Sequence, residues 1–62
     1  SQEGLRIPQN FDYNSCPSLS EEMKLRLQSF MPVNLGAASR LPGITPAAIV
    51  ALMHQLQKDI HK

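Results

Sequence analysis

The most regular alternation of apolar and polar positions lies near the end of the chain. After Thr45, apolar residues recur at intervals of three and four, which places them on one face of an α-helix. Thr45 can cap such a helix, and Pro46 suits its first position, where a missing N–H costs nothing. The pattern therefore predicts an amphipathic helix over residues 45–60. Its apolar stripe consists of Ile49, Leu52, Met53, Leu56 and Ile60.

A shorter helix is predicted directly before it, over about residues 35–41. Asn34 is a natural N-cap, because its side chain can accept a hydrogen bond from an amide of the first turn. Pro42 and Gly43 end the helix, since proline cannot continue it and glycine tolerates unusual backbone angles. A helix of two turns is unstable alone and has to be held by packing. The residues expected to face the core are Leu35, Ala38 and Leu41.

Another helix is predicted to begin near Ser18 or Ser20 and to end shortly before Pro32. Ser18 and Glu21 have the spacing of a capping box, and glutamates in a first turn complement the helix dipole. One face of this helix is apolar and carries Leu19, Met23, Leu27 and Phe30. Lys24 and Arg26 lie away from that face. They are expected to be solvated, with contact to RNA as the alternative.

Residues 1–17 have no regular period. In this arm the large apolar residues are Ile7, Phe11 and Tyr13. They are expected to fasten the arm to the helices, because large apolar side chains gain most from burial. The alternative is that Tyr13 is an exposed stacking or docking group. The fold class predicted is all-α: a single domain over residues 1–62, with an extended arm over residues 1–17 and a small three-helix bundle over residues 18–60.

Composition excludes several classes of protein. The formal net charge of +1 argues against a strong generic nucleic-acid binder, which normally carries a basic stripe. Cys16 is the only cysteine, so neither an internal disulfide nor a cysteine zinc site can form, and this fits a reducing, cytoplasmic setting. No apolar run is long enough to span a membrane, and no signal peptide is recognisable.

The groups that carry catalysis are missing from the sequence. There is no glycine-rich phosphate loop, no paired carboxylates and no Ser/His/Asp order. His54 and His61 are too far apart for a helical two-histidine metal site, which needs i, i+4 spacing. Nothing supports pairing Cys16 with His54 as nucleophile and base. We therefore expect no catalytic residue, metal site or cofactor site in this chain.

The LPGI stretch at residues 41–44 is similar to the hairpin of helix-hairpin-helix modules. In such modules an LPGIG turn offers backbone amides to a phosphate, as helix N-termini also do. Here Thr45 replaces the second glycine and caps the following helix. A helix-hairpin-helix module that binds duplex DNA at Gly43 is therefore kept as an alternative function.

Three stretches carry a wider resemblance. Ile7-Pro8 precedes Phe11-Asp12-Tyr13, Leu19-Ser20 precedes Glu22 with leucines after it, and residues 35–49 read LGAASRLPGITPAAI. In this order they resemble the IP-x-x-FDY, LS-x-E and (I/L)G-x-ASR-I-x-G-(V/I)-TPAAI segments at the C-terminal end of the GidA/MnmG family. These proteins are the large flavoprotein subunits of the tRNA uridine 5-carboxymethylaminomethyl modification enzyme.

The resemblance implies a parent protein with several properties. It would bind FAD, use NADH and modify the wobble uridine of certain tRNAs together with a GTPase partner, MnmE. The dinucleotide-binding domains would lie N-terminal to this chain, and the parent would be cytoplasmic and dimeric. The helical C-terminal domain of the family is implicated in contacting the GTPase and in holding tRNA. A purely structural tail that packs on the body of the parent is a further alternative.

On this resemblance the candidate binding surface is the polar corner around residues 36–45. Arg40 is the first choice for a charged contact. Ser39 and Thr45 are expected to form hydrogen bonds beside it, and Gly36 and Gly43 to allow close approach or the turn itself. Weaker candidates, for long-range attraction, are Lys24, Arg26 and Lys58.

Overall fold

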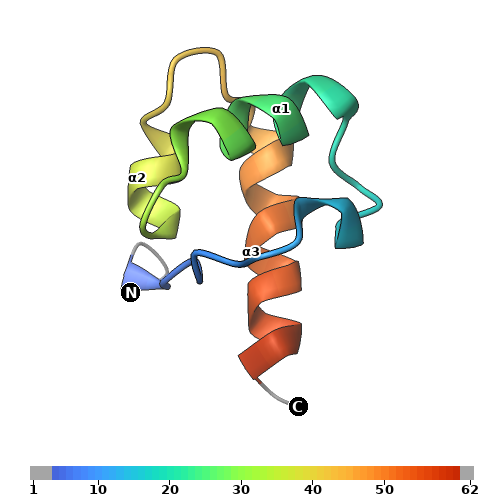
Figure 1. Ribbon diagram of the computed structural model, residues 1–62, viewed down its shortest axis with the longest axis vertical. Helices are drawn as coiled ribbons and strands as arrows, with labels where there is room; N and C mark the ends of the chain where they lie inside the picture. Colours follow the sequence, from blue (N-terminus) through green and yellow to red (C-terminus); the bar gives the residue numbers. More distant parts are fainter. Residues whose placement is uncertain (1–3, 61–62) are drawn as a thin grey trace.

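The computed structural model describes residues 4–60. A short 3-10 helix, η2 (Tyr13–Ser15), precedes three α-helices, α1 (Glu21–Phe30), α2 (Leu35–Ser39) and α3 (Pro46–Ile60) (Figure 1). No strand forms within residues 4–60; instead an isolated antiparallel bridge joins Arg6 and Asn34. The all-α prediction is therefore confirmed.

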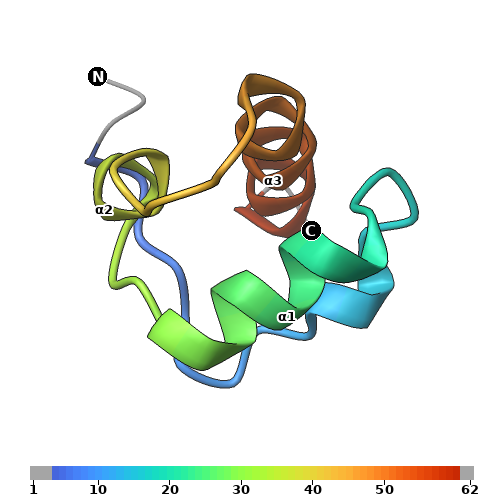
Figure 2. The ribbon, with the colours of Figure 1, turned by 90° about the horizontal axis from the view of Figure 1, so that it is seen from above.

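The helices surround one apolar core. Figure 2 shows α2 and α3 end-on, whereas α1 is seen from the side and crosses them. α2 packs mainly on α3, and α1 packs mainly on η2. Leu27 of α1 and Leu52 of α3 are completely buried. The core residues are Ile7, Tyr13, Cys16, Leu19, Met23, Leu27, Leu35, Ala38, Ala48, Leu52 and Leu56.

The helix predicted to begin near Ser18 or Ser20 is α1, and Ser20 is the correct one of the two starting residues. Ser20 is the N-cap of α1, and its Oγ accepts a hydrogen bond from the Met23 amide at 3.3 Å. The capping box between Ser18 and Glu21 is wrong, because α1 begins after Ser20. Of the four residues on the predicted apolar face of this helix, Phe30 is the one that is not buried. Phe30 is the last residue of α1, where the chain leaves the helix through a left-handed residue, and its side chain stays 51% exposed.

Local capping residues set the first turns of α2 and α3 as expected. Asn34 Oδ1 accepts from the Ala37 amide at 2.7 Å, and Thr45 Oγ1 accepts from the Ala48 amide at 3.2 Å. α2 ends at Ser39, earlier than residue 41, because the Arg40 amide already closes a tighter turn onto the Ala37 carbonyl. In the predicted α3 stripe, Leu52 and Leu56 are buried, while Ile49 and Met53 are half-buried. The side chain of Ile60 lies outside the described part of the chain.

The N-terminal arm is fastened to the segment that connects α1 to α2. The Ile7 amide donates to the Val33 carbonyl at 3.0 Å, and the Leu35 amide donates to the Leu5 carbonyl at 2.8 Å. Tyr13 is buried, and Phe11 packs edge-on against it with ring centroids 5.0 Å apart. The prediction that these side chains hold the arm is confirmed, and the alternative of an exposed Tyr13 is wrong.

Candidate functional site

The corner between α2 and α3 is a tight turn. The Ile44 amide donates to the Leu41 carbonyl at 3.3 Å, which closes a four-residue turn around Pro42 and Gly43. Gly43 has φ of +79°, the left-handed backbone that the third residue of a type II turn requires. Proline in the second position and glycine in the third therefore define the direction in which the chain enters α3.

Both flanks of this turn are held by hydrogen bonds. The Ser39 hydroxyl donates to the Gly36 carbonyl at 2.7 Å, and the Arg40 amide donates to the Ala37 carbonyl at 3.2 Å. Thr45 Oγ1 accepts a hydrogen bond from the Ala48 amide and so caps α3. The Ser39 hydroxyl can still accept a hydrogen bond and the Thr45 hydroxyl can still donate one. Gly36 is buried, so it faces the interior of the bundle rather than solvent.

Arg26 joins α1 to this corner. Its Nη1 donates to the Pro42 carbonyl at 2.9 Å, and its Nη2 lies 3.4 Å from Glu22 Oε2. The side chain of Lys24 is only 13% exposed, and its Nζ lies 3.3 Å from Glu21 Oε1. The expectation of a solvated face is therefore wrong for Arg26 and Lys24. Their aliphatic stems pack on the protein, and their charged ends meet glutamates one turn earlier.

The remaining candidate cations do not share one surface. Arg40 is exposed at the C-cap of α2, beside the turn. Lys58 is exposed in the last turn of α3. It lies twelve positions after Pro46, about 18 Å along the helix axis at 1.5 Å per residue. The structure thus brings Arg26, Arg40 and Gly43 to the corner and leaves Lys58 at the other end of the molecule.

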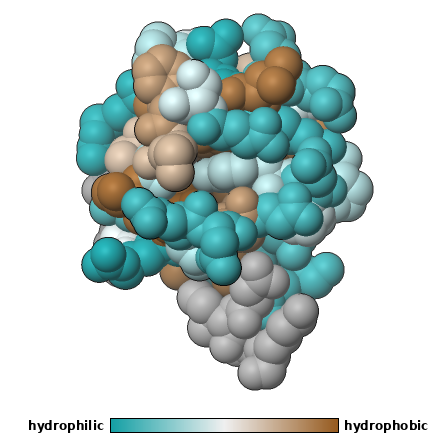
Figure 3. Space-filling model, in the orientation of Figure 1, coloured by the Kyte–Doolittle hydropathy of each residue, from teal (hydrophilic) through white to brown (hydrophobic). Residues whose placement is uncertain are grey.

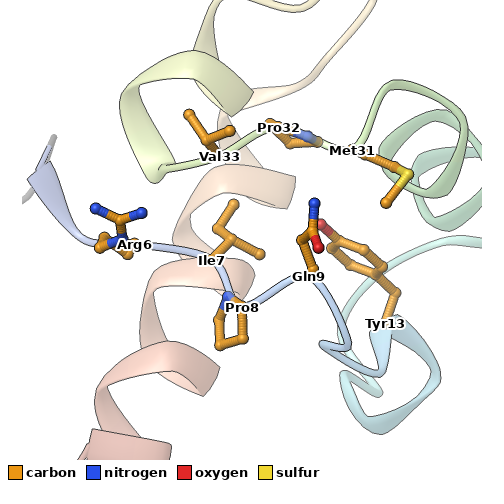
Figure 4. A pocket seen from close by; sticks show the side chains of 8 residues that line it. All are labelled: Arg6, Ile7, Pro8, Gln9, Tyr13, Met31, Pro32 and Val33. Carbon is orange, nitrogen blue, oxygen red and sulfur yellow. The ribbon is translucent and has the colours of Figure 1, made fainter.

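A second surface feature is a groove of about 470 Å³ that the sequence did not reveal. Met31 and Val33 stand on one side of it, and residues 6–9 of the arm on the other (Figure 4). Tyr13 closes one end, with its hydroxyl directed towards Gln9 in the same view. The eight lining residues are Arg6, Ile7, Pro8, Gln9, Tyr13, Met31, Pro32 and Val33. They include one cation and no anion.

Large apolar side chains are exposed at the groove and elsewhere. Met31 is 56% exposed and Val33 is 65% exposed, and Met31 also adopts a left-handed conformation with φ of +49°. A non-glycine residue costs about 1 kcal/mol in this conformation, so folding alone does not favour methionine here. Figure 3 shows apolar patches separated by polar surface on the face it presents.

Tyr13 has a perturbed ionisation. Burial raises the pKa of the Tyr13 phenol above its ordinary value of 10.0, and the charge of Cys16 adds to the rise. The charged form is disfavoured because removing a phenolate from water is costly. Tyr13 is therefore a neutral residue at the end of the groove at physiological pH.

This shift predicts a loss of stability in alkali. As the pH rises, Tyr13 ionises near pH 10 in the unfolded chain and only at a higher pH in the folded chain. The contribution of Tyr13 to the free energy of unfolding is therefore complete below pH 10 and is lost as the pH rises through the raised folded pKa. The thermal unfolding midpoint of the wild type should therefore fall more steeply above pH 10 than that of Tyr13→Phe. Parallel pH profiles for the two proteins would contradict the prediction.

Catalytic arrangements are not found in the part of the chain that the structure describes. No group of three or more metal-ligating side chains occurs among residues 4–60. Cys16 is buried and His54 is exposed, so the thiol is not presented to a substrate beside an imidazole base. His61 lies outside the described residues. No helix within residues 4–60 has both the length and the apolar character needed to cross a bilayer.

The sequence of the chain was compared with those of known protein families. Residues 1–62 match the family described as the tRNA modifying enzyme MnmG/GidA C-terminal helical bundle. The chain belongs to this family, as its sequence motifs had indicated.

Individual relatives agree with that assignment. The chain is 48% identical over 56 residues to the tRNA uridine 5-carboxymethylaminomethyl modification enzyme MnmG of Sulfurihydrogenibium sp., and 46% identical over 56 residues to the MnmG of Aquifex aeolicus. Each match covers 90% of this chain and 9% of the relative. The crystal structure of Aquifex aeolicus GidA superposes with a TM-score of 0.86 at 45% identity, again over 90% of this chain and 9% of that one. The chain therefore spans about a tenth of the length of these relatives.

The sequence missed two features of this site. The contact of Arg26 with the turn joins residues 16 positions apart, and no local pattern marks it. The only signal was the i, i+4 spacing of Glu22 and Arg26, which predicts their ion pair but not the Pro42 contact. The groove was missed because its walls come from the arm and from the α1–α2 connection, which the sequence does not show to be neighbours.

Proposed function

We propose that this chain is the C-terminal docking domain of a tRNA-modifying flavoprotein, and that it binds the GTPase partner MnmE and assists in holding tRNA. The observation that carries the proposal is an exposed Arg40 beside a turn that is fixed on both flanks, in a member of the MnmG/GidA family. Chemistry on the wobble uridine, with FAD and NADH, belongs to the rest of a cytoplasmic and dimeric parent.

A protein partner is favoured over RNA as the main occupant of this domain. Arg26 and Lys24 are paired with glutamates, and the net charge of the chain is +1, so no strong positive field is available. Phosphate binding depends on such a field. The exposed apolar side chains Met31 and Val33 suit a protein surface instead. tRNA contact is then a secondary role of the corner.

The two alternatives make different predictions. A helix-hairpin-helix module needs backbone amides at the turn that are free to bind a phosphate. Here the Ala48 amide already donates a hydrogen bond to Thr45 Oγ1, and Pro46 has no N–H. It would also show steep salt dependence of duplex DNA binding, because neutralised phosphates release counterions. A purely structural tail would bind neither GTPase nor tRNA and would expose an apolar surface when separated from its parent.

Replacing Arg40 by alanine tests the docking proposal. In the full-length parent protein, Arg40→Ala should weaken binding of the GTPase, of tRNA or of both by about tenfold, the effect of one charged hydrogen bond. Separate titrations with purified GTPase and with substrate tRNA at near-physiological salt would measure this. The domain should stay folded, with an unfolding free energy lowered by at most about 1 kcal/mol, the upper range for one exposed polar contact.

Lys58→Ala is the matched control. It removes the same charge from the opposite end of α3, so it should leave both affinities within about twofold if the contact is local rather than long-range. Arg40→Lys should recover the part of the affinity that depends on charge alone. Unchanged binding of both ligands in Arg40→Ala would remove the corner from the interface and favour a structural tail.

A further inference from the structure

Arg26 fits the turn more closely than a surface ion pair would. A Cβ built on Gly43 would lie 2.8 Å from Arg26 Cζ, 3.0 Å from Nη1 and 3.1 Å from Nη2. Because these three distances are nearly equal, the flat face of the guanidinium occupies the space that a side chain at position 43 would need. Glycine at this position therefore serves both the left-handed backbone and the approach of Arg26.

The guanidinium is held in place by two contacts of different kinds. Nη1 donates to the Pro42 carbonyl at 2.9 Å, while Nη2 meets Glu22 Oε2 at 3.4 Å. Nε is buried without a hydrogen-bond partner. A buried N–H without a partner is unfavourable, and a solvated arginine would avoid it. The arrangement is thus specific to the turn rather than a general surface charge.

This contact adds a polar link between α1 and the turn to the packing of all three α-helices on the common core. α1 packs mainly on η2, and α2 packs mainly on α3. Arg26 reaches from the middle of α1 to the carbonyl of Pro42, two residues after Arg40. It therefore holds the turn against α1 at Pro42, three residues after the end of α2.

We infer that Arg26 is a positioning residue: it holds the turn at residues 41–44 against α1 and thereby fixes the direction in which Arg40 projects. The inference rests on the proposed function in that Arg40 is the residue that contacts the partner. Arginine is required because one planar group has to cover Gly43 and bond Pro42 and Glu22 together. A lysine ammonium offers charge without that plane.

Hydrogen exchange in the full-length parent tests the positioning itself. With millisecond labelling, Arg26→Ala should speed exchange of the peptide over residues 40–49 by about tenfold, as expected for loss of one hydrogen bond that holds it. Arg26→Lys should behave like Arg26→Ala. Lys24→Ala removes an equal charge and a similar glutamate pair from the same helix, so it should leave this peptide unchanged. Faster exchange throughout α1, α2 and α3, or wild-type exchange in Arg26→Lys, would overturn the inference.

A double-mutant cycle tests whether Arg26 acts through Arg40. Titration with the purified GTPase and with tRNA should show that Arg26→Ala weakens binding severalfold in the wild type but has no further effect in Arg40→Ala. Additive losses would mean that Arg26 contacts the partner directly and would overturn the positioning role. If Arg40→Ala itself has no effect, the docking proposal fails. The exchange experiment still decides whether Arg26 holds the turn.

Discussion

Truncating Leu52 to alanine should destabilise the domain by about 3 kcal/mol, the typical cost of deleting a fully buried leucine side chain. Leu52 lies on α3 with no exposed surface, so its removal leaves a cavity in the single core. A domain of 62 residues has a total stability of roughly 3–9 kcal/mol. The variant should therefore lose between about a third and all of this stability, as measured by circular dichroism during urea titration.

Val50→Ala is the control for this experiment. Val50 occupies the same helix but is 47% exposed, and alanine is the better helix former. Its replacement should change the unfolding free energy by less than about 1 kcal/mol in either direction. Equal destabilisation by the two substitutions would show that α3 is not packed in solution as it is here.

Replacing Gly43 by alanine should destabilise the domain by about 2 kcal/mol. The left-handed backbone with φ of +79° costs an alanine about 1 kcal/mol. The added Cβ would lie 2.8 Å from Arg26 Cζ, so the guanidinium has to move away and lose its bond to the Pro42 carbonyl. Loss of that hydrogen bond contributes a further 0.5–1.5 kcal/mol or thereabouts. Chemical denaturation of wild type and variant would measure the difference.

Gly4→Ala provides the matched control for this glycine. A Cβ at Gly4 would meet no atom within 4 Å, and Gly4 does not have positive φ. The substitution should leave the unfolding free energy within about 0.5 kcal/mol of the wild type. Because Gly43→Ala also displaces Arg26, Arg26→Ala should destabilise the Gly43→Ala background less than the wild type. Full additivity of the two changes would show that the displaced guanidinium is not part of the cost.

Local signals in the sequence predicted the helices and most of the corner. Asn34 and Thr45 cap their helices with the hydrogen bonds expected of them, and Pro42 with Gly43 forms the turn. These outcomes depend on residues within four positions of one another. The same reasoning failed for Ser18 and Phe30. Local spacing did not show which serine caps α1, and it did not show that no other segment covers the side chain at the end of the helix.

The sequence by itself thus determined the order of helices, the caps of α2 and α3, the leucine core and membership of a family. Tertiary structure alone decided that the arm pairs with residues 33–35, that a groove opens between them, and that Arg26 covers Gly43. Capping and helical periodicity act between near neighbours, so a linear pattern records them. The pairing of the arm and the contact of Arg26 with Pro42 arise only when distant segments pack on a common core, and no spacing along the chain encodes where they meet.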